Sequence, residues 1–137
     1  MELQVGVKIL LENEEGKFLI LHRNPEKYAW SKDRDSFDIV GGRITTGVPL
    51  IKNLKREIKE ETGLKVKGEP ELLAAQDIIK PDQERHVVRL TYLGIAEGVV
   101  KLSDENLEYK WMDADEISAL DSMDKYSKEV LAKLFIE

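Results

Sequence analysis

The feature that most constrains the fold of this 137-residue chain is a glycine pair at 41–42 that leads into an acidic segment ending at Gly63. In that segment Glu57, Glu60 and Glu61 are spaced by three and four residues, so a helix places their carboxylates on one face. Like charges at these spacings repel one another. Because hard cations such as Mg²⁺ and Mn²⁺ prefer carboxylate oxygens, a divalent metal ion is the simplest explanation for the arrangement.

Residues 50–62 also have the hydrophobic periodicity of an amphipathic helix. The apolar stripe of this helix is expected to consist of Leu50, Ile51, Leu54 and Ile58. We expect Leu54 and Ile58 to be buried against the rest of the protein. On the opposite side of the helix, Lys55 and Lys59 are expected to be exposed.

The acidic face has a simpler interpretation, as the solvated surface of an ordinary helix. Such surfaces usually place charges of opposite sign at a spacing of four residues. Here Glu57 is followed at that spacing by Glu61, and Lys55 is followed by Lys59. This segregation of charge, together with the glycine-rich entry, favours a metal site.

The whole segment closely resembles the Nudix box of the Nudix (MutT-like) pyrophosphohydrolases. The matching positions are Gly42, Arg56, Glu57, Ile58, Glu60, Glu61, Gly63 and Leu64. The resemblance implies that Glu60 and Glu61 carry most of the metal ligation and that Glu57 assists them. It also implies that the backbone carbonyl of Gly41 joins the ligands and that Arg56 orients a glutamate by ion pairing.

Two positions depart from the pattern of the family. Val48 stands where the family has a glutamate that helps to hold the loop and the box arginine, and Val40 replaces a proline that commonly precedes the glycines. Val48 offers no charge and is a poor N-cap before Pro49. The metal ligands remain in place, but the change at Val48 keeps open a catalytically impaired, Nudix-like ligand-binding domain.

Further candidate residues lie outside the box. Glu105 best fits the position, several residues before Trp111, at which many Nudix enzymes have a glutamate that completes the metal shell or acts as base; Glu108 is the alternative. Arg23 matches a position at which related enzymes often hold an arginine near the nucleotide. Asp38 could read the edge of a base. An ordinary surface role is the competing interpretation of Glu105 and Arg23.

The glycine pair and two aromatic residues are candidates for contact with substrate. Gly41 and Gly42 could form a simple turn, but their position between a strand and the loop before the acidic helix favours a close backbone approach. Tyr28 and Trp30 could stack on a base, although aromatic residues in loops often cover a core instead.

The order of the predicted elements indicates an α/β fold. We expect strands at 5–11, 17–22, 37–40, 72–79, 85–95 and 108–112, a helix from Pro49 to about Thr62, and a helical turn at 115–120. A C-terminal amphipathic helix is expected to carry on one side Tyr126, Val130, Leu131, Leu134 and Phe135. Strands interrupted by two helices favour an α/β sandwich. The resemblance implies a Nudix-like α/β/α sandwich with a mixed central sheet, in a single domain of residues 1–137.

Composition limits the partners and the compartment. A net charge of −6 gives no general attraction to nucleic acid polymers or to anionic membranes. No apolar stretch reaches membrane-spanning length, and the N-terminal residues have the pattern of a strand rather than of a signal peptide. The absence of cysteine excludes disulfides and thiolate metal sites and fits a reducing cytoplasm. A homodimer is compatible with these features.

The sequence therefore predicts a Mg²⁺- or Mn²⁺-dependent Nudix hydrolase that cleaves a nucleoside diphosphate linked to another group. The small size favours a nucleoside triphosphate or a damaged nucleotide as substrate. ADP-ribose or a similar nucleotide derivative is the alternative, because Pro81 lies close to the position of a proline in ADP-ribose-cleaving members. A carboxylate of Glu60, Glu61 or Glu105 would accept the proton of the attacking water, and the sequence does not choose among them.

Overall fold

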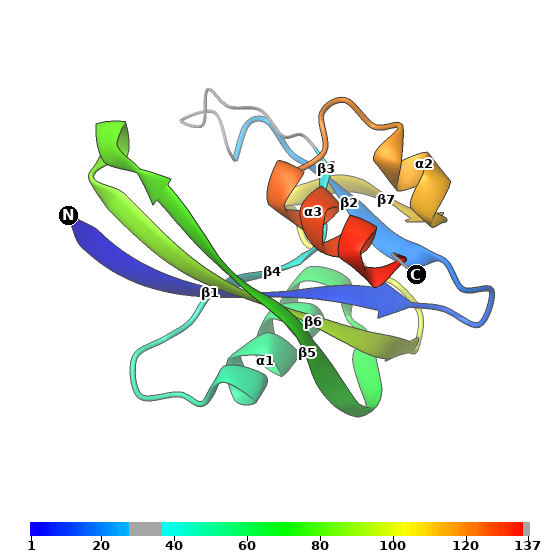
Figure 1. The fold of residues 1–137 in the computed structure, drawn as a ribbon. Coiled ribbons are helices and arrows are strands. Elements are labelled where there is room, and N and C mark those ends of the chain that lie inside the picture. The colour runs from blue at the N-terminus through cyan, green and yellow to red at the C-terminus, as the bar shows by residue number, and fades with distance from the viewer. Residues whose placement is uncertain (28–36, 136–137) are drawn as a thin grey trace.

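The computed structural model describes residues 1–27 and 37–135, so Tyr28 and Trp30 lie outside the described residues. Within these ranges a mixed sheet of seven strands has helices on both of its faces (Figure 1). The strands are β1 (Glu2–Glu12), β2 (Phe18–Arg23), β3 (Phe37–Asp38), β4 (Val40–Arg43), β5 (Lys65–Lys80), β6 (Arg85–Glu97) and β7 (Asn106–Met112). The helices are α1 (Leu50–Thr62), α2 (Ala114–Ser118) and α3 (Lys125–Leu134), with a 3-10 turn, η1 (Pro81–Gln83). None of these helices has the length and apolar character needed to cross a membrane.

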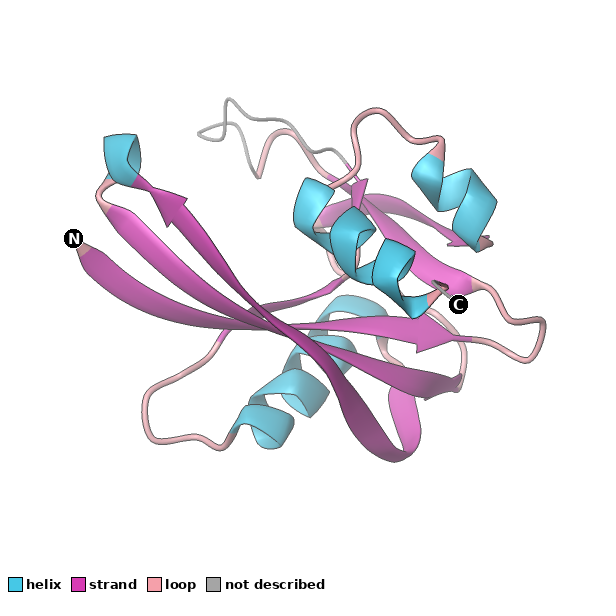
Figure 2. Cartoon of the chain, viewed as in Figure 1, coloured by secondary structure: helices cyan, strands magenta, loops and turns pink. Residues whose placement is uncertain are grey.

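The sheet is organised around the long strand β1. The main strand order is β3-β2-β1-β6-β5, with β4 paired to β1 and β7 paired to β2. Figure 2 shows the strands in magenta and the helices in cyan. β1 runs parallel to β6 and antiparallel to β2 and β4. β2 meets β1 at Glu12, whereas β4 pairs with it from Gly6 to Ile9. The two strands therefore share one edge of β1, and β4 brings its glycines into the middle of the sheet.

Alternate side chains of β1 build the two halves of the core. Val7, Ile9 and Leu11 belong to a buried cluster that includes the apolar stripe of α1. Leu10 points the other way and belongs to a second cluster, with side chains from α2 and α3. Because successive strand side chains point to opposite faces, one continuous apolar run supports both helical layers. The predicted α/β/α sandwich with a mixed sheet is confirmed.

Three predicted elements differ from the structure. β5 begins well before the expected strand 72–79, because shifts in its register with β6 accommodate Gly68 and Pro70, residues that usually interrupt strands. The expected strand 37–40 is divided between β3 and β4. The placement of Phe135 on the buried side of the C-terminal helix was wrong, since it lies beyond the end of α3 and is 57% exposed.

One end of the sheet extends away from the helices (Figure 1). There the first residues of β1 lie beside the connection between β5 and β6, which contains η1. The backbone amide of Glu2 donates a hydrogen bond of 2.8 Å to the carbonyl oxygen of Glu84 and ties the two segments together. We refer to residues 2–6 and 78–87 as the arm.

Candidate active site

Helix α1 is held against the sheet by its apolar stripe. Leu54 and Ile58 are fully buried, whereas Lys55 and Lys59 are exposed, as predicted. The helix ends at Gly63, which has a left-handed conformation (φ 71°) and donates its amide hydrogen to the carbonyl oxygen of Lys59. This packing directs the acidic face of α1 toward the glycines of β4.

The glycine pair of β4 allows the acidic face to approach the backbone of the sheet. A Cβ atom on Gly42 would lie 2.8 Å from the carboxyl carbon of Glu57, and a Cβ atom on Gly41 would lie 2.1 Å from the carbonyl oxygen of Val7. The amide of Gly41 donates a hydrogen bond of 3.0 Å to a carboxylate oxygen of Glu61. A larger residue at either position would displace a glutamate or the backbone of β1.

The three box glutamates have different environments. Glu61 is 8% exposed, Glu57 is half-buried, and Glu60 is exposed. Arg56 lies between two of them, 3.4 Å from a carboxylate oxygen of Glu57 and 3.3 Å from one of Glu60. Across residues 1–27 and 37–135, no three His, Cys, Asp or Glu side chains form a ready cluster around one metal position. The assignment of the metal ligands stays a prediction.

The electrostatics of the acidic face nevertheless fit a cation. Burial, together with repulsion from Glu57 and Glu105, raises the pKa of Glu61 to about 7, although Lys8 opposes this rise. Burial also raises the pKa of Glu57. Crowded, poorly hydrated carboxylates are a donor set that a divalent ion would stabilise, because its charge offsets both their repulsion and their lost hydration.

Glu105 is the better of the two candidates outside the box. Its charge contributes to the raised pKa of both Glu57 and Glu61, which places it near the acidic face of α1. Glu108, the alternative, is instead 3.5 Å from a ring nitrogen of His22. The electrostatic influence of Glu105 supports it as a further metal ligand or base.

Asn53 holds the loop before α1 in place through hydrogen bonds, although it was not among the residues predicted from the motif. Its fully buried side-chain amide donates hydrogen bonds to the carbonyl oxygens of Val48 at 2.8 Å and Pro49 at 3.1 Å. Its side-chain oxygen accepts hydrogen bonds from the Thr45 amide at 2.9 Å and from Arg56 at 3.1 Å. Asn53 therefore joins the loop to Arg56, the task that the family glutamate at position 48 was expected to perform.

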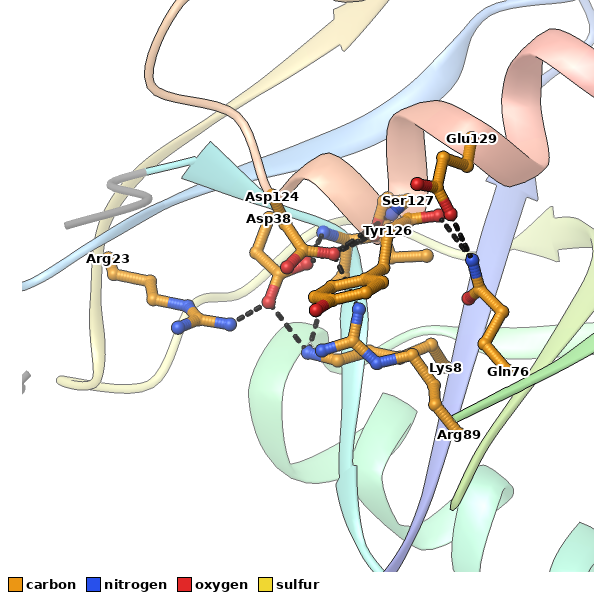
Figure 3. A network of polar contacts seen from close by, with 10 residues as sticks. Lys8, Arg23, Asp38, Gln76, Arg89, Asp124, Tyr126, Ser127 and Glu129 are labelled. Carbon is orange, nitrogen blue, oxygen red and sulfur yellow. Dashed lines mark hydrogen bonds and ion pairs between the residues drawn. The ribbon is translucent and has the colours of Figure 1, made fainter. Parts of the chain in front are cut away.

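A buried network of charged side chains lies on the α3 side of the sheet (Figure 3). Lys8 Nζ is 2.7 Å from a carboxylate oxygen of Asp38, and Arg23 forms an ion pair with the same carboxylate. Arg89 pairs with Asp124, which also caps the N-terminus of α3. The structure thus brings together Arg23 and Asp38, two predicted site residues, and adds three residues that the sequence analysis missed.

The charged groups of the network shift the pKa values of one another. Burial, together with the charges of Arg23 and Arg89, lowers the pKa of Lys8 to about 7, although Glu61 and Asp124 oppose the shift. Burial by itself would raise the pKa of Asp124, but Arg89, Lys8 and hydrogen bonds from Ser127 hold it below its usual value. The single charge of Lys8 within an apolar strand was the one sequence signal that could have revealed this network.

An open cavity of about 840 Å³ connects the network to the acidic helix. Its size suits a small-molecule ligand. Five of the predicted site residues line it, namely Arg23, Asp38, Gly41, Gly42 and Glu61. The predicted residues outside the lining are Arg56, Glu57, Glu60 and Glu105. Glu61 is therefore the box carboxylate that faces the cavity directly.

Comparison with known proteins assigns the family. The model of the NUDIX domain matches residues 2–134, and no curated protein matches the chain in sequence.

The solved structure of the MutT protein from Methanosarcina mazei Go1 is 25% identical, with a TM-score of 0.80 over 96% of this chain and 91% of that one. The MutT NUDIX hydrolase from Burkholderia pseudomallei is 20% identical, with a TM-score of 0.79 over 98% of this chain and 99% of that one. The NUDIX hydrolase from Nitrosomonas europaea is 21% identical, with a TM-score of 0.77 over 97% of this chain and 88% of that one. Because the family model spans nearly the whole chain, this protein belongs to the Nudix family and is a Nudix hydrolase.

Proposed function

We propose that the protein is a divalent-metal-dependent nucleotide pyrophosphohydrolase whose substrate is a nucleoside triphosphate or a damaged nucleotide. The observation that most supports this proposal is the hydrogen bond between Gly41 and Glu61, which places a carboxylate of the acidic helix in the wall of the cavity. The same cavity is lined by cationic side chains, including Lys8, Arg23 and Arg89, that suit a phosphorylated ligand. ADP-ribose and similar nucleotide derivatives remain the alternative substrates.

The residues proposed to hold the metal ion are Glu57, Glu60 and Glu61, together with the carbonyl oxygen of Gly41. Oxygen donors of this kind suit Mg²⁺ or Mn²⁺. When bound, such an ion polarises the phosphoryl oxygens and lowers the pKa of a coordinated water. Arg56, which lies between Glu57 and Glu60, would keep both carboxylates oriented toward the site.

In the proposed reaction water attacks one phosphorus of the anhydride. The bond between that phosphorus and the bridging oxygen breaks, and the leaving phosphate takes the electron pair. Glu60, Glu61 and Glu105 are the candidate bases for the proton of the water, and the position of Glu61 in the cavity wall favours it. Arg23 and Asp38 would contact the nucleotide within the same cavity.

A panel of nucleotides incubated with Mg²⁺ or Mn²⁺, with products separated by ion exchange, tests this function. The panel should contain nucleoside triphosphates, oxidised nucleotides, ADP-ribose and nucleoside diphosphate sugars. We expect a nucleoside monophosphate and a second phosphorylated product from at least one member, and no products when EDTA is present. Absence of cleavage across the panel with either metal would instead support a ligand-binding domain without activity.

The hydrogen bonds of Asn53 weaken the case for an impaired domain. Because Arg56 already contacts Asn53, Glu57 and Glu60, a glutamate at position 48 would add little. We therefore expect Val48→Glu to leave kcat within about twofold of the wild type, as an exposed ion pair is typically worth 0–1 kcal/mol. Steady-state kinetics with the best substrate of the panel measures this. An increase in kcat of tenfold or more would show that the hydrogen bonds of Asn53 do not already hold the loop before α1 in place.

Asn53→Ala should have the opposite outcome. The substitution removes four hydrogen bonds and deprives the part-buried Thr45 amide and Val48 carbonyl of their Asn53 partner, which should cost about 1–3 kcal/mol of unfolding free energy. We also expect kcat to fall, because Arg56 loses one of the contacts that position it. Urea unfolding and steady-state kinetics check the two effects. Wild-type stability and kcat together would contradict the role assigned to Asn53.

A further inference from the structure

We propose that the arm forms a second anion-binding subsite, which holds a negatively charged part of the substrate beyond the scissile diphosphate. This inference rests on the proposed function and extends it to the substrate class. The part of the cavity wall contributed by the arm and by the adjoining end of β4 contains three cationic residues, Arg43, Lys80 and Arg85, and one carboxylate, Asp82. In a chain whose net charge is −6, this excess of positive charge in a cavity requires an explanation.

The strand registers place these cations along one face of the sheet. Gly6 of β1 pairs with Arg43 of β4 on one side and with Arg89 of β6 on the other. Farther along the arm, Lys80 of β5 pairs directly with Arg85 of β6. Like charges directly opposite each other on neighbouring strands destabilise a sheet. Glu2 of β1 lies opposite Arg85 on its other side and reduces this repulsion, and an anion bound in the cavity would reduce it further.

The row of cations begins beside the catalytic helix and leads away from it. Arg43 lies two residues after Gly41, whose amide binds Glu61, and all three residues line the cavity. Arg85 pairs with Glu2, four residues before Gly6, so the backbone positions of Arg43 and Arg85 are about 13 Å apart along the strands. A substrate whose diphosphate lies near Glu61 could therefore extend a further phosphate along the arm. This geometry favours nucleotides that carry a further phosphate beyond the scissile diphosphate over those that carry a neutral sugar there.

Gly6 keeps the path between the two parts of the cavity open. Gly6 lines the cavity between Gln4 and Lys8. Because it has no side chain, it leaves space in the cavity at the position opposite Arg43. A Cβ atom there would lie 3.6 Å from the carbonyl oxygen of Gly42, an ordinary contact distance. Gly6→Ala should therefore be tolerated, whereas Gly6→Leu should narrow the path that the substrate follows onto the arm.

Binding of inorganic tripolyphosphate without divalent metal, measured by isothermal titration calorimetry, tests the subsite directly. We expect Arg85→Gln to weaken binding about tenfold, as loss of a charge-assisted contact to phosphate typically does. Lys67→Gln is the matched control, because Lys67 is an exposed cation of β5 that does not line the cavity. The control should bind like the wild type. Equal affinities for the wild type and for a folded Arg85→Gln variant would overturn the proposal.

Kinetics then separate the subsite from the function on which it rests. Arg85→Gln and Gly6→Leu should raise KM about tenfold for substrates with an additional phosphate, while their kcat/KM for a nucleoside diphosphate sugar changes less than twofold. The Lys67→Gln control should keep the wild-type KM for both kinds of substrate. Equal losses for substrates with an additional phosphate and for nucleoside diphosphate sugars would refute the subsite while leaving the hydrolase assignment intact. Tripolyphosphate binding that depends on Arg85, in a protein that cleaves no nucleotide, would refute the hydrolase and retain the subsite.

Discussion

Glu61→Gln should lower kcat by about a hundredfold or more, as the loss of a main charge-stabilising group in an active site typically does. Glu61 is the box carboxylate that lines the cavity, and it is held in place by the amide of Gly41. Glutamine preserves the size of the side chain and can accept the same hydrogen bond. The substitution therefore removes the negative charge with little change to the packing of α1.

The stability of this variant distinguishes a lost charge from a damaged fold. Because burial raises the pKa of Glu61, its ionised form is disfavoured in the folded protein, and Glu61→Gln should unfold at the same or a higher urea concentration near neutral pH. Glu69→Gln, on the exposed surface of β5, is the matched control and should keep wild-type activity. A Glu61→Gln variant with an unchanged rate would remove Glu61 from the proposed mechanism.

Leu54→Ala is expected to reduce the free energy of unfolding by about 2–5 kcal/mol, because it leaves a cavity in a buried cluster. Leu54 has no exposed surface and packs in the half of the core that joins α1 to β1. This contact fixes the position of the acidic face relative to the glycines of β4. The variant should therefore lose activity at temperatures at which the wild type is still folded.

Urea unfolding of Leu54→Ala beside Lys55→Ala provides the comparison. Lys55 is the next residue of the same helix and is exposed, so its replacement should change stability by no more than about 0.5 kcal/mol. A loss below about 1 kcal/mol at Leu54 would contradict the close packing of α1 on the sheet.

The features of the fold that were predictable are those set by local sequence. The phase of α1 follows from the spacing of Leu54 and Ile58, and its end follows from Gly63, whose left-handed conformation suits glycine. The extent of β5 was not predictable, because Gly68 and Pro70 usually interrupt strands and only pairing with β6 overrides them. Local propensity cannot report such a long-range pairing.

The candidate site was predictable only in part, for the same reason. The box glutamates are close in sequence, so their common face could be derived from helical spacing. The ion pairs of Lys8 with Asp38 and of Arg89 with Asp124 join residues that are far apart in the chain. A motif cannot identify such partners, although a lone lysine in an apolar strand indicates that a buried partner is needed. Asn53 was missed because a polar helix residue ordinarily faces solvent.

Titration of the protein with Mn²⁺, followed by electron paramagnetic resonance of the free ion, tests the central claim most directly. The claim is that the acidic face of α1 binds the metal on which hydrolysis depends. We predict that the wild type and the Glu69→Gln control bind Mn²⁺ equally, and that Glu57→Gln, Glu60→Gln and Glu61→Gln each weaken binding about tenfold or more while the proteins remain folded. Equal Mn²⁺ affinity in the wild type and all three box variants would contradict the account.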